Sequence, residues 1–407
     1  MSITLNTIDE ALSDLRSGKA IIVVDDEDRE NEGDFVAAAE TITPELVNFF
    51  VKHGRGILCV SITSKRAEEL HLEPIVENNT SLHETPFTVP IDFLHGTSTG
   101  VSASDRALTI KAITNVSTRA NDFGKPGHVF PLRSVEGGVL QRAGHTEAVV
   151  DLCRLAGLYP AGALVEIMND DGTMARLPEL VEIAEKFDLK IVSIRDLVEH
   201  RQHREKLVEK VVTTYLPTPN GKFDVHLYKS SIDSKEHLAL IKGAIDALKP
   251  ILVRVHSECL TGDVFGSQRC DCNEQLHTSL SKIEKEGTGI VLYMRQEGRG
   301  IGLLNKLKAY KLQDEGKDTV EANEALGFHA DVRDYSLAAQ ILLDLGVKKV
   351  RLLTNNPKKI VGLKGFGIEV VERVPIEVKA TTTNEKYLRT KRDKMGHLLD
   401  LMDPDKK

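Results

Sequence analysis

Short β-branched runs alternate with helical stretches along the whole chain, and this alternation restricts the fold more than any other feature of the sequence. The expected strands are 20–24, 57–62, 163–168, 190–194, 251–256, 289–294 and 349–353. The expected helices are 44–53, 147–156, 178–187, 236–248, 274–286, 303–315 and 335–345. Such a pattern predicts the α/β class with mixed (α+β) sheets.

The length of the chain predicts two domains. A chain of 407 residues is long for one hydrophobic core and comfortable for two. The densely charged helical stretch 196–210 offers little to bury, and the prolines and the Asn-Gly pair of 216–221 follow it before a new strand. We therefore expect two fused domains, residues 1–203 and residues 204–407, each a sheet covered by helices.

Composition and charge exclude several classes of protein. A net charge of −8 argues against a basic nucleic-acid surface, and the absence of tryptophan argues against platforms that stack bases. No apolar run approaches the ~20 residues that span a bilayer, and the first residues lack the basic and apolar regions of a signal peptide. We expect a cytoplasmic protein that binds neither nucleic acid nor membranes.

A cluster of cysteines gives the clearest chemical signal. Three of the five cysteines in the chain fall close together, at Cys259, Cys270 and Cys272. An odd total suits metal binding in a reducing compartment better than disulfides. Structural zinc usually takes four protein ligands, whereas catalytic zinc takes three and leaves a position for water. Three thiolates therefore favour catalytic Zn²⁺, and a closed site with His256 or His277 as fourth ligand is the alternative.

Polar residues near the cysteines suit an anionic substrate. Arg254 and His256 share one face of the strand expected before Cys259. A glycine-rich loop that contains Glu297 and Arg299 connects an apolar strand to a helix, where backbone N–H groups and the helix dipole can meet an anion. Glu297 suits the N–H donors of a purine and Arg299 suits a phosphate. For the glycines alone, a tight turn is the alternative.

These segments resemble GTP cyclohydrolase II across essentially all of residues 204–407. The matching blocks are Arg-Val-His-Ser-Glu-Cys-Leu-Thr-Gly-Asp, Arg-Cys-Asp-Cys, Arg-Gln-Glu-Gly-Arg-Gly-Ile-Gly-Leu, Asp-Thr-Val-Glu-Ala-Asn and Leu-Leu-Thr-Asn-Asn-Pro-Lys-Lys. The resemblance implies hydrolytic opening of the guanine imidazole ring of GTP, with release of formate and pyrophosphate. The expected pyrimidine product is 2,5-diamino-6-(5-phosphoribosylamino)pyrimidinone.

The same resemblance implies a role for each matching residue. The zinc ligands would be Cys259, Cys270 and Cys272. GTP would contact Arg254, Val255, His256, Ser257, Glu258, Gln275, Glu297, Gly298, Arg299, Thr319, Thr354 and Lys359. The expected catalytic residues are Asp331 as general base, Arg333 at the α-phosphate and Tyr310 near the ring-opening chemistry. Because guanidinium stays protonated, stabilisation of the leaving pyrophosphate suits Arg333 better than nucleophilic attack.

An acidic loop dominates the first half of the chain. Seven carboxylates in ten residues, 25–34, directly follow the first expected strand. A solvated acidic surface is the alternative to a site. Three residues elsewhere favour a site: His145, in a small-residue loop before a helix, together with His128 and Glu166. A structural histidine is the alternative for His145. Hard oxygen ligands with one imidazole suit Mg²⁺ or Mn²⁺.

This half resembles 3,4-dihydroxy-2-butanone-4-phosphate synthase over roughly residues 1–200. The resemblance is carried by Asp-Asp-Glu-Asp-Arg-Glu-Asn-Glu-Gly-Asp, Val-Glu-Asn-Asn-Thr, Pro-Gly-His-Val-Phe-Pro-Leu, Gly-His-Thr-Glu-Ala and Asn-Asp-Asp-Gly-Thr-Met-Ala. It implies conversion of D-ribulose 5-phosphate to 3,4-dihydroxy-2-butanone 4-phosphate, with loss of one carbon as formate.

Here too the resemblance implies individual roles. Ligands of Mg²⁺ or Mn²⁺ would be Glu30 and His145. The sugar phosphate would contact Arg29, Glu30, Asp34, Arg142, Ala143, Gly144, His145, Thr146 and Glu166. His128 and Glu166 would be catalytic, with Glu32 a weaker addition. A metal across the C2 carbonyl and C3 hydroxyl would acidify the C–H bond between them, so that a carboxylate or imidazole can remove the proton.

Together the two halves resemble bifunctional enzymes that supply both precursors of riboflavin. We expect separate active sites, small-molecule substrates and, by family analogy, a homodimer or larger homo-oligomer. One alternative is a zinc hydrolase that acts on another purine nucleotide or stops at a single ring opening. Another is a regulatory binding protein that zinc holds together.

Overall fold

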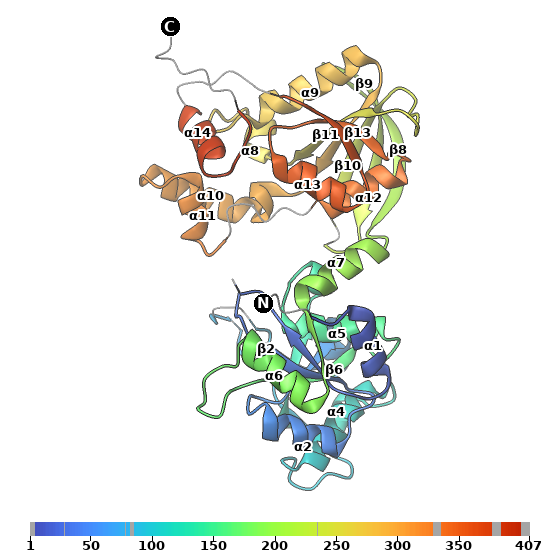
Figure 1. The fold of residues 1–407 in the computed structure, drawn as a ribbon, viewed down its shortest axis with the longest axis vertical. Coiled ribbons are helices and arrows are strands. Elements are labelled where there is room, and N and C mark those ends of the chain that lie inside the picture. Colours follow the sequence, from blue (N-terminus) through green and yellow to red (C-terminus); the bar gives the residue numbers. More distant parts are fainter. Residues whose placement is uncertain are drawn as a thin grey trace. The chain divides into compact units, whose positions relative to one another are not determined.

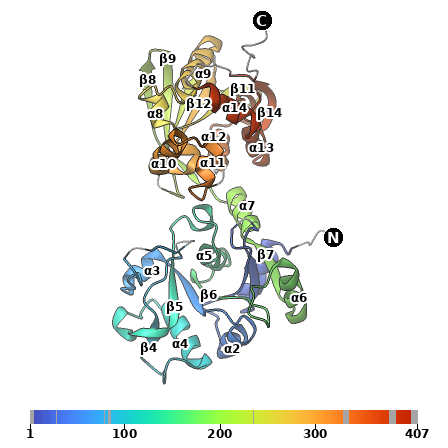
Figure 2. The same ribbon diagram turned by 90° about the vertical axis from the view of Figure 1, so that its left-hand side faces the viewer.

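Two compact units divide the chain between Glu205 and Lys206. The computed structural model describes residues 5–27, 29–77, 79–81, 85–233, 235–328, 335–376 and 384–399. Over these residues each unit contains one seven-stranded sheet with helices against it (Figures 1 and 2). Both sheets contain parallel and antiparallel pairs, for example β1 with β7 and β1 with β2 in the first. The predicted α/β class with mixed sheets is confirmed.

The first unit has the strand order β4-β5-β3-β6-β2-β1-β7. Its strands are β1 (Ile21–Val24), β2 (Gly33–Ala38), β3 (Cys59–Thr63), β4 (Ile91–Phe93), β5 (Phe123–Ser134), β6 (Ala161–Glu166) and β7 (Lys190–Ser193). Its helices are α1 (Ile8–Arg16), α2 (Pro44–His53), α3 (Ser64–Glu69), α4 (Ala103–Thr114), η1 (Ala120–Asp122), η2 (Gly138–Leu140), α5 (His145–Leu155), α6 (Leu177–Phe187) and α7 (Ile194–Arg204).

Strand β1 is buried on both faces, which explains its uninterrupted apolar sequence. Ile22 and Val24 belong to the core that α2, α4 and α6 form on one face of the sheet. Ile21 and Val23 belong to the core that α1, α5 and α7 form on the other. Since both faces are closed by helices, polar groups reach solvent mainly from the ends of the strands.

The second unit has the strand order β14-β13-β11-β12-β10-β9-β8. Its strands are β8 (Val208–Thr218), β9 (Gly221–Ser230), β10 (Glu236–Lys242), β11 (Ile251–Ser257), β12 (Gly289–Met294), β13 (Lys349–Leu353) and β14 (Glu369–Val374). Its helices are α8 (Leu260–Asp263), α9 (Cys272–Glu286), η3 (Glu297–Gly300), α10 (Gly302–Asp314), α11 (Thr319–Glu324), α12 (Ser336–Asp344), α13 (Pro357–Gly365) and α14 (Glu385–Asp393).

Strands β11 to β14 pair in parallel and form the half of this sheet that carries the site. Leu280 and Ile283 of α9 pack on Leu252 of β11 and its neighbours on one face. Helices α12 and α13 lie over the same strands from the opposite side (Figure 1). Loops that follow parallel strands meet at one edge of the sheet, which is the usual position of ligands in such folds.

One predicted helix is wrong. Residues 236–248 were expected to be helical, but β10 occupies Glu236–Lys242 and pairs antiparallel with β9 and β12. The side chains of Leu238 and Leu240 lie on the face of the sheet that α9 covers. Those of Ala239 and Ile241 therefore lie on the opposite face. A strand buried on both faces reads as a continuous apolar run, and Leu and Ala also suit helices, so the sequence was ambiguous.

The other predicted elements are present. All seven predicted strands and the other six predicted helices have ends within two residues of the observed ones. The proline-containing stretch 216–221, however, does not connect domains. Leu216 to Thr218 end β8, and the turn at Asn220 leads into β9 in a hairpin. Over the described ranges, no helix has both the length and the apolar character needed to cross a membrane.

Two arginines on α7 give a matched test of stability. Arg201 contacts Asp151 at 2.7 Å with 8% of its side chain exposed, whereas Arg204 contacts Asp9 with 60% exposed. Arg201→Met leaves the buried carboxylate of Asp151 with its weaker pair to the half-exposed Arg154, 3.4 Å away, and we expect it to destabilise the first unit by about 3 kcal/mol. Arg204→Met should change little, because exposed ion pairs contribute weakly. Hydrogen exchange of the α5 amides, monitored by mass spectrometry, measures the stability of both variants. Equal protection of these amides in the two variants contradicts the prediction.

Candidate active sites in the two units

A cleft of about 1050 Å³, its mouth included, opens in the second unit. Its walls include Ser257 at the end of β11 with Glu258 after it, the loop 297–299 after β12, and Thr354 to Asn356 after β13. Three adjacent parallel strands therefore point their carboxyl ends at one cavity. Its size falls in the range of small-molecule sites.

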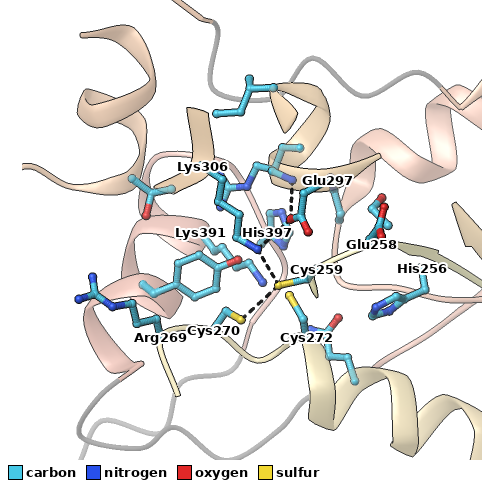
Figure 3. A pocket seen from close by; sticks show the side chains of 18 of the residues that line it. His256, Glu258, Cys259, Arg269, Cys270, Cys272, Glu297, Lys306, Lys391 and His397 are labelled. Carbon is cyan, nitrogen blue, oxygen red and sulfur yellow. Dashed lines mark hydrogen bonds and ion pairs between the residues drawn. The ribbon is translucent and has the colours of Figure 1, made fainter. Parts of the chain in front are cut away.

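The three predicted zinc ligands converge in this cleft (Figure 3). Cys259 follows β11, and Cys272 begins α9 two residues after Cys270. Their three Sγ atoms all lie within 4.8 Å of one another, with 3.7 Å between those of Cys259 and Cys270. A Cβ added to Gly262 would come within 3.0 Å of the sulfurs of Cys259 and Cys270. This close set of thiols fits a single Zn²⁺ ion.

Neither histidine considered as a fourth ligand joins the cluster. His256 Nε2 lies 3.1 Å from Asp263 Oδ1, and His277 Nδ1 lies 2.6 Å from Asn220 Nδ2. Within the described ranges, no further histidine, cysteine or carboxylate groups with the three sulfurs. The donor set therefore has the three-ligand form of a catalytic zinc site.

A buried lysine lies against the cysteine cluster. Lys306 Nζ of α10 donates to Cys259 Sγ at 3.1 Å and to Glu297 Oε1 at 2.8 Å (Figure 3). Hydrogen bonds from the other two thiols, and then the Lys306 ammonium, lower the pKa of Cys259. Cys259 therefore favours the thiolate, the form that binds metal. Glu297 also accepts from the backbone N–H of Leu260 at 2.6 Å, which ties the glycine-rich loop to the cysteine loop.

A carboxylate under the cleft holds the cysteine loop in place. Asp263 Oδ2 accepts from the backbone N–H of Cys259 and from the hydroxyl of Tyr293, both at 2.9 Å. Asp263 also binds His256, whose ring stacks on that of Tyr293 with 5.6 Å between centroids. The short helix α8 therefore fixes both the loop that carries Cys259 and the orientation of His256.

Tyr310 lies one helical turn beyond Lys306 on α10. Its hydroxyl is 3.2 Å from Thr261 Oγ1, and the guanidinium of Arg269 lies 5.0 Å from the centre of its ring. Burial raises the pKa of Tyr310, so the phenol keeps its proton at neutral pH. Tyr310 can therefore donate a hydrogen bond in the cleft.

Most predicted GTP contacts are gathered in this cleft. Every one of them except Val255 lines it. The side chain of Val255 is buried in the sheet, and its carbonyl accepts from Lys359 Nζ at 2.6 Å. Of the three predicted catalytic residues, Tyr310 lines the cleft, whereas Asp331 and Arg333 lie outside the described residues.

Several lining residues were not predicted from sequence. Among them are Lys306, Asn356, Tyr387, Lys391 and His397. The buried amide nitrogen of Asn356 has no hydrogen-bond partner among the described residues, which is costly unless a ligand accepts from it. Lys306 had one usable signal, its position four residues before Tyr310. The last three come from the C-terminal segment, where the sequence shows no motif.

Lys391 forms a buried ion pair at the edge of the cysteine cluster. Its Nζ lies 2.6 Å from Oδ1 of Asp271, the residue between Cys270 and Cys272. Burial alone would lower the pKa of Lys391, but the Asp271 carboxylate raises it above its ordinary value. Lys391 in turn lowers the pKa of Asp271 against the effect of burial. Both groups are therefore charged.

In the first unit, sheet pairing brings together residues that are distant in sequence. Asp34 of β2 lies opposite Glu166 of β6 and, on its other side, opposite Val23 of β1. Glu166 Oε2 accepts from the backbone N–H of Ile57 at 2.9 Å, just before β3. Since β3 also pairs with β5, the sequence position of His128 falls at this same edge of the sheet. The predicted catalytic residues thus share one edge.

The acidic loop wraps around one of its own carboxylates. The Asp25 side chain is fully buried and accepts from the backbone N–H groups of Glu30 (3.1 Å) and Glu32 (2.8 Å). Arg29 donates to Asp25 and pairs with Glu30, each at 2.9 Å. Asp25 had no assigned role in the sequence, yet its ligand atom lies within 4.8 Å of those of Glu30 and His145. These three residues form a candidate metal site.

His145 has the orientation of a metal ligand. Its Nε2 lies 3.2 Å from the carbonyl oxygen of Val23, which only an N–H can contact favourably, so Nδ1 is left toward Glu30 Oε2 at 3.9 Å. Burial lowers the pKa of His145, so the ring is neutral at neutral pH. A neutral imidazole that donates its other N–H to a carbonyl is the usual state of a ligating histidine.

The pKa values of two carboxyl groups beside this cluster, Asp34 and Glu32, are raised. Burial, and then the charge of Glu166 and the neighbouring acids, raises the pKa of Asp34 well above its ordinary value. Burial and the charge of Glu30 raise the pKa of Glu32 as well. Asp34 therefore tends to keep its proton, which lets it donate a hydrogen bond beside the acceptor Glu166.

His128 is oriented by a residue that was not predicted. Its Nδ1 lies 2.7 Å from Asp92 Oδ2, and its backbone N–H donates to Asp92 Oδ1 at 2.9 Å. The Asp92 carboxylate can only accept, so Nδ1 carries the proton and Nε2 is left as a base. Nearly half of the His128 side chain is exposed, so a substrate can reach it.

The remaining predicted contacts surround the start of α5. Gly144 is the residue before the helix, and Thr146 lies in its first turn. Arg142 donates to Glu147 Oε2 at 2.6 Å, and burial raises the pKa of Glu147. A Cβ at Gly144 would come within 2.4 Å of the Arg142 guanidinium. The backbone N–H groups of this helix end, together with Arg142, suit a phosphate.

Comparison with known families assigns one family to each unit. The 3,4-dihydroxy-2-butanone 4-phosphate synthase family matches residues 9–200, and the GTP cyclohydrolase II family matches residues 209–375. The chain is 60% identical to the riboflavin biosynthesis protein RibBA of Bacillus cereus (strain G9842) over 394 residues, which cover 97% of this chain and 99% of that protein. It is 58% identical to RibBA of Bacillus cytotoxicus over the same shares.

A solved structure has the same two-domain fold. It is RibBX of A. baumannii, described as a two-domain 3,4-dihydroxy-2-butanone 4-phosphate synthase. Its TM-score is 0.70 at 34% identity, with 92% of this chain and 100% of that chain covered. The chain therefore belongs to the family of bifunctional riboflavin biosynthesis proteins, with a 3,4-dihydroxy-2-butanone 4-phosphate synthase half followed by a GTP cyclohydrolase II half.

Proposed function

We propose that the chain catalyses two reactions in two separate sites. Residues 1–203 convert D-ribulose 5-phosphate to 3,4-dihydroxy-2-butanone 4-phosphate and formate. Residues 204–407 hydrolyse GTP to 2,5-diamino-6-(5-phosphoribosylamino)pyrimidinone, formate and pyrophosphate. The observation that carries the second assignment is the group of three cysteine sulfurs in the cleft, which no fourth ligand from the described residues completes.

In the cyclohydrolase site, Cys259, Cys270 and Cys272 would hold Zn²⁺. Bound there, the ion would supply a Lewis acid and a water of lowered pKa. Lys306 and Asp263 keep the cysteine loop in place, because one contacts the Cys259 sulfur and the other its backbone N–H. The chain thus presents the three sulfurs together within the cleft.

The rest of this cleft suits a guanine nucleotide. Glu297 would accept from the N–H groups of the base, while Arg254 and Lys359, which line the same cleft, would meet the phosphates with positive charge. The amide of Asn356 offers a further donor. Tyr310 holds a proton beside the cysteine loop and can donate it to a nitrogen freed by ring opening. Asp331 as general base and Arg333 at the α-phosphate remain sequence predictions.

In the synthase site, Glu30 and His145 would hold Mg²⁺ or Mn²⁺, with Asp25 next to them. A bound divalent cation would polarise the carbonyl and hydroxyl of the sugar. His128, oriented by Asp92, and Glu166 are the bases that can remove a proton from carbon. Asp34, protonated, can donate to a substrate oxygen. Arg29, Arg142 and Ala143 to Thr146 would bind the phosphate end.

The remaining sequence predictions complete the proposal. Both substrates are small molecules, and neither nucleic acid nor membrane is needed as a partner. A homodimer or larger homo-oligomer and a cytoplasmic location are expected from the family and from the composition.

Cys259→Ser tests the assignment of the second site. We expect zinc content and GTP turnover to fall together, by more than the roughly 10–100-fold that loss of an outer contact to a metal ligand costs. Ribulose 5-phosphate cleavage should be retained, which also serves as the control for folding. Zinc is measured by atomic absorption and products by chromatography; loss of both activities contradicts separate sites.

Metal removal and replacement distinguish the two sites. After chelation and dialysis of the whole protein, both activities should be lost. Added Mg²⁺ or Mn²⁺ should restore formate release from ribulose 5-phosphate, because hard oxygen ligands prefer these ions. Added Zn²⁺ should restore GTP hydrolysis, because thiolates prefer zinc. Restoration of GTP hydrolysis by Mg²⁺ alone would contradict the assignment of zinc to the second site.

His128→Asn should lower the rate of ribulose 5-phosphate cleavage by roughly 10²–10⁴-fold, the usual contribution of a general base. Asp92→Asn should lower it less and shift its pH profile, since it alters the orientation and basicity of His128 without removing it. GTP turnover of each variant is the internal reference. A His128→Asn variant that retains full synthase activity disproves the role.

A further inference from the structure

The C-terminal helix forms one wall of the cyclohydrolase cleft although it lies beyond the residues that the GTP cyclohydrolase II family matches. The GTP cyclohydrolase II match ends at residue 375, whereas α14 begins at Glu385. Tyr387 and Lys391 of α14, and His397 after it, nevertheless line the cleft. Figure 3 shows Lys391 and His397 beside the three cysteines.

Helix α14 and the residues directly after it contact three other parts of the chain that border the cleft. Lys394 pairs with Glu321 of α11 at 2.9 Å. The backbone N–H of Leu398 donates to the carbonyl of Asn355, which follows β13, at 2.8 Å. The guanidinium of Arg299 in η3 lies 5.8 Å from the centre of the Tyr387 ring. These contacts give α14 a defined position against the site.

A chain of polar contacts runs from Lys391 into the substrate face of the cleft. Lys391 Nζ contacts Asp271 Oδ1 at 2.6 Å, and the other carboxylate oxygen, Oδ2, accepts from Gln275 Nε2 at 2.6 Å. Gln275 Oε1 in turn accepts from the guanidinium of Arg254. Arg254 also donates to the carbonyl of Leu353 at 2.9 Å. Arg254 and Gln275 both line the cleft.

Each residue in this series of contacts fixes the orientation of the next. The amide of Gln275 is oriented because its nitrogen faces the Asp271 carboxylate, which leaves its oxygen for Arg254. Asp271 is almost completely buried, and Lys391 balances its charge. Without Lys391, an uncompensated carboxylate would stand next to the cleft and attract the Arg254 guanidinium away from the substrate.

We propose that Lys391 is a positioning residue of the nucleotide site, which orients Gln275 and Arg254 for GTP through Asp271 and makes α14 a functional part of the cyclohydrolase. The proposal rests on the proposed GTP reaction. It assigns Lys391 no contact with the reacting atoms. Its effect is on how well GTP is bound.

The test compares steady-state GTP kinetics of full-length, zinc-loaded variants. Lys391→Met should raise KM for GTP at least tenfold with kcat within threefold of wild type, since the misplaced residues bind substrate. Lys391→Arg should recover most of the loss, because it restores the charge beside Asp271. The matched control is Arg389→Met on the same helix, which removes an exposed pair with Glu385 of that helix and should leave KM within twofold.

A double variant shows whether Lys391 acts through Asp271. Asp271→Asn removes the charge but keeps an oxygen to hold Gln275. In that background, Lys391→Met should raise KM by less than threefold, because no carboxylate is left to balance. An unchanged tenfold effect in the double variant would mean that Lys391 touches GTP directly, and the positioning role would be overturned.

The remaining outcomes are also decisive. If Lys391→Met lowers kcat with KM unchanged, the helix serves only folding, and the proposal is wrong. If zinc content of the variant falls while the KM of the loaded fraction is normal, Lys391 supports the metal loop instead, which also overturns it. Failure of the wild-type protein to hydrolyse GTP would refute the proposed function itself, and is thereby distinguishable from failure of this inference.

Discussion

Burial of both faces of the strands that lead into the sites, such as β1 and β11, is the constraint on which the rest of the structure depends. Strands such as β1 and β10 have apolar side chains on both faces because helices or neighbouring cores cover both. Charged groups can then be accommodated only at strand ends and in the loops that follow. Both candidate sites obey this constraint: one follows β1 and β6, the other follows β11, β12 and β13.

The charges that are concentrated in the two sites are balanced by different groups. In the first unit, Asp25 is neutralised by Arg29 and by backbone N–H groups, and Asp34 tends to remain protonated. The acidic loop is therefore ordered around its own carboxylates. In the second unit, Lys306 balances Cys259 and Lys391 balances Asp271. Hard oxygen donors in one unit and soft sulfur donors in the other prefer different ions.

Sequence predicted well those features that are local. The spacing of Cys259, Cys270 and Cys272 identified a metal site because a short loop and one helix start suffice to bring the sulfurs together. Element positions followed from apolar periodicity, except in 236–248, where a two-sided strand has the composition of a helix. Arg254 and His256 were placed correctly because alternation along a strand fixes their face.

Residues that act only through tertiary contacts could not be found from sequence. Asp92 orients His128 across 36 positions, and Lys391 reaches Asp271 across 120. A lone lysine or aspartate has no pattern that distinguishes it from the many on the surface. Asp25 was one of seven acids in its loop, and only its burial shows that it organises the others. The contacts of these residues became visible only once the pairing of the strands and the position of α14 were known.

Gly262 shows how backbone shape alone determines the size of the cysteine site. Even a methyl group at this position would stand 3.0 Å from two of the sulfurs. The space in which the three thiols approach one another therefore depends on the absence of a side chain at this position. Because Gly262 lies in α8, the position of this short helix limits how much room the three sulfurs have.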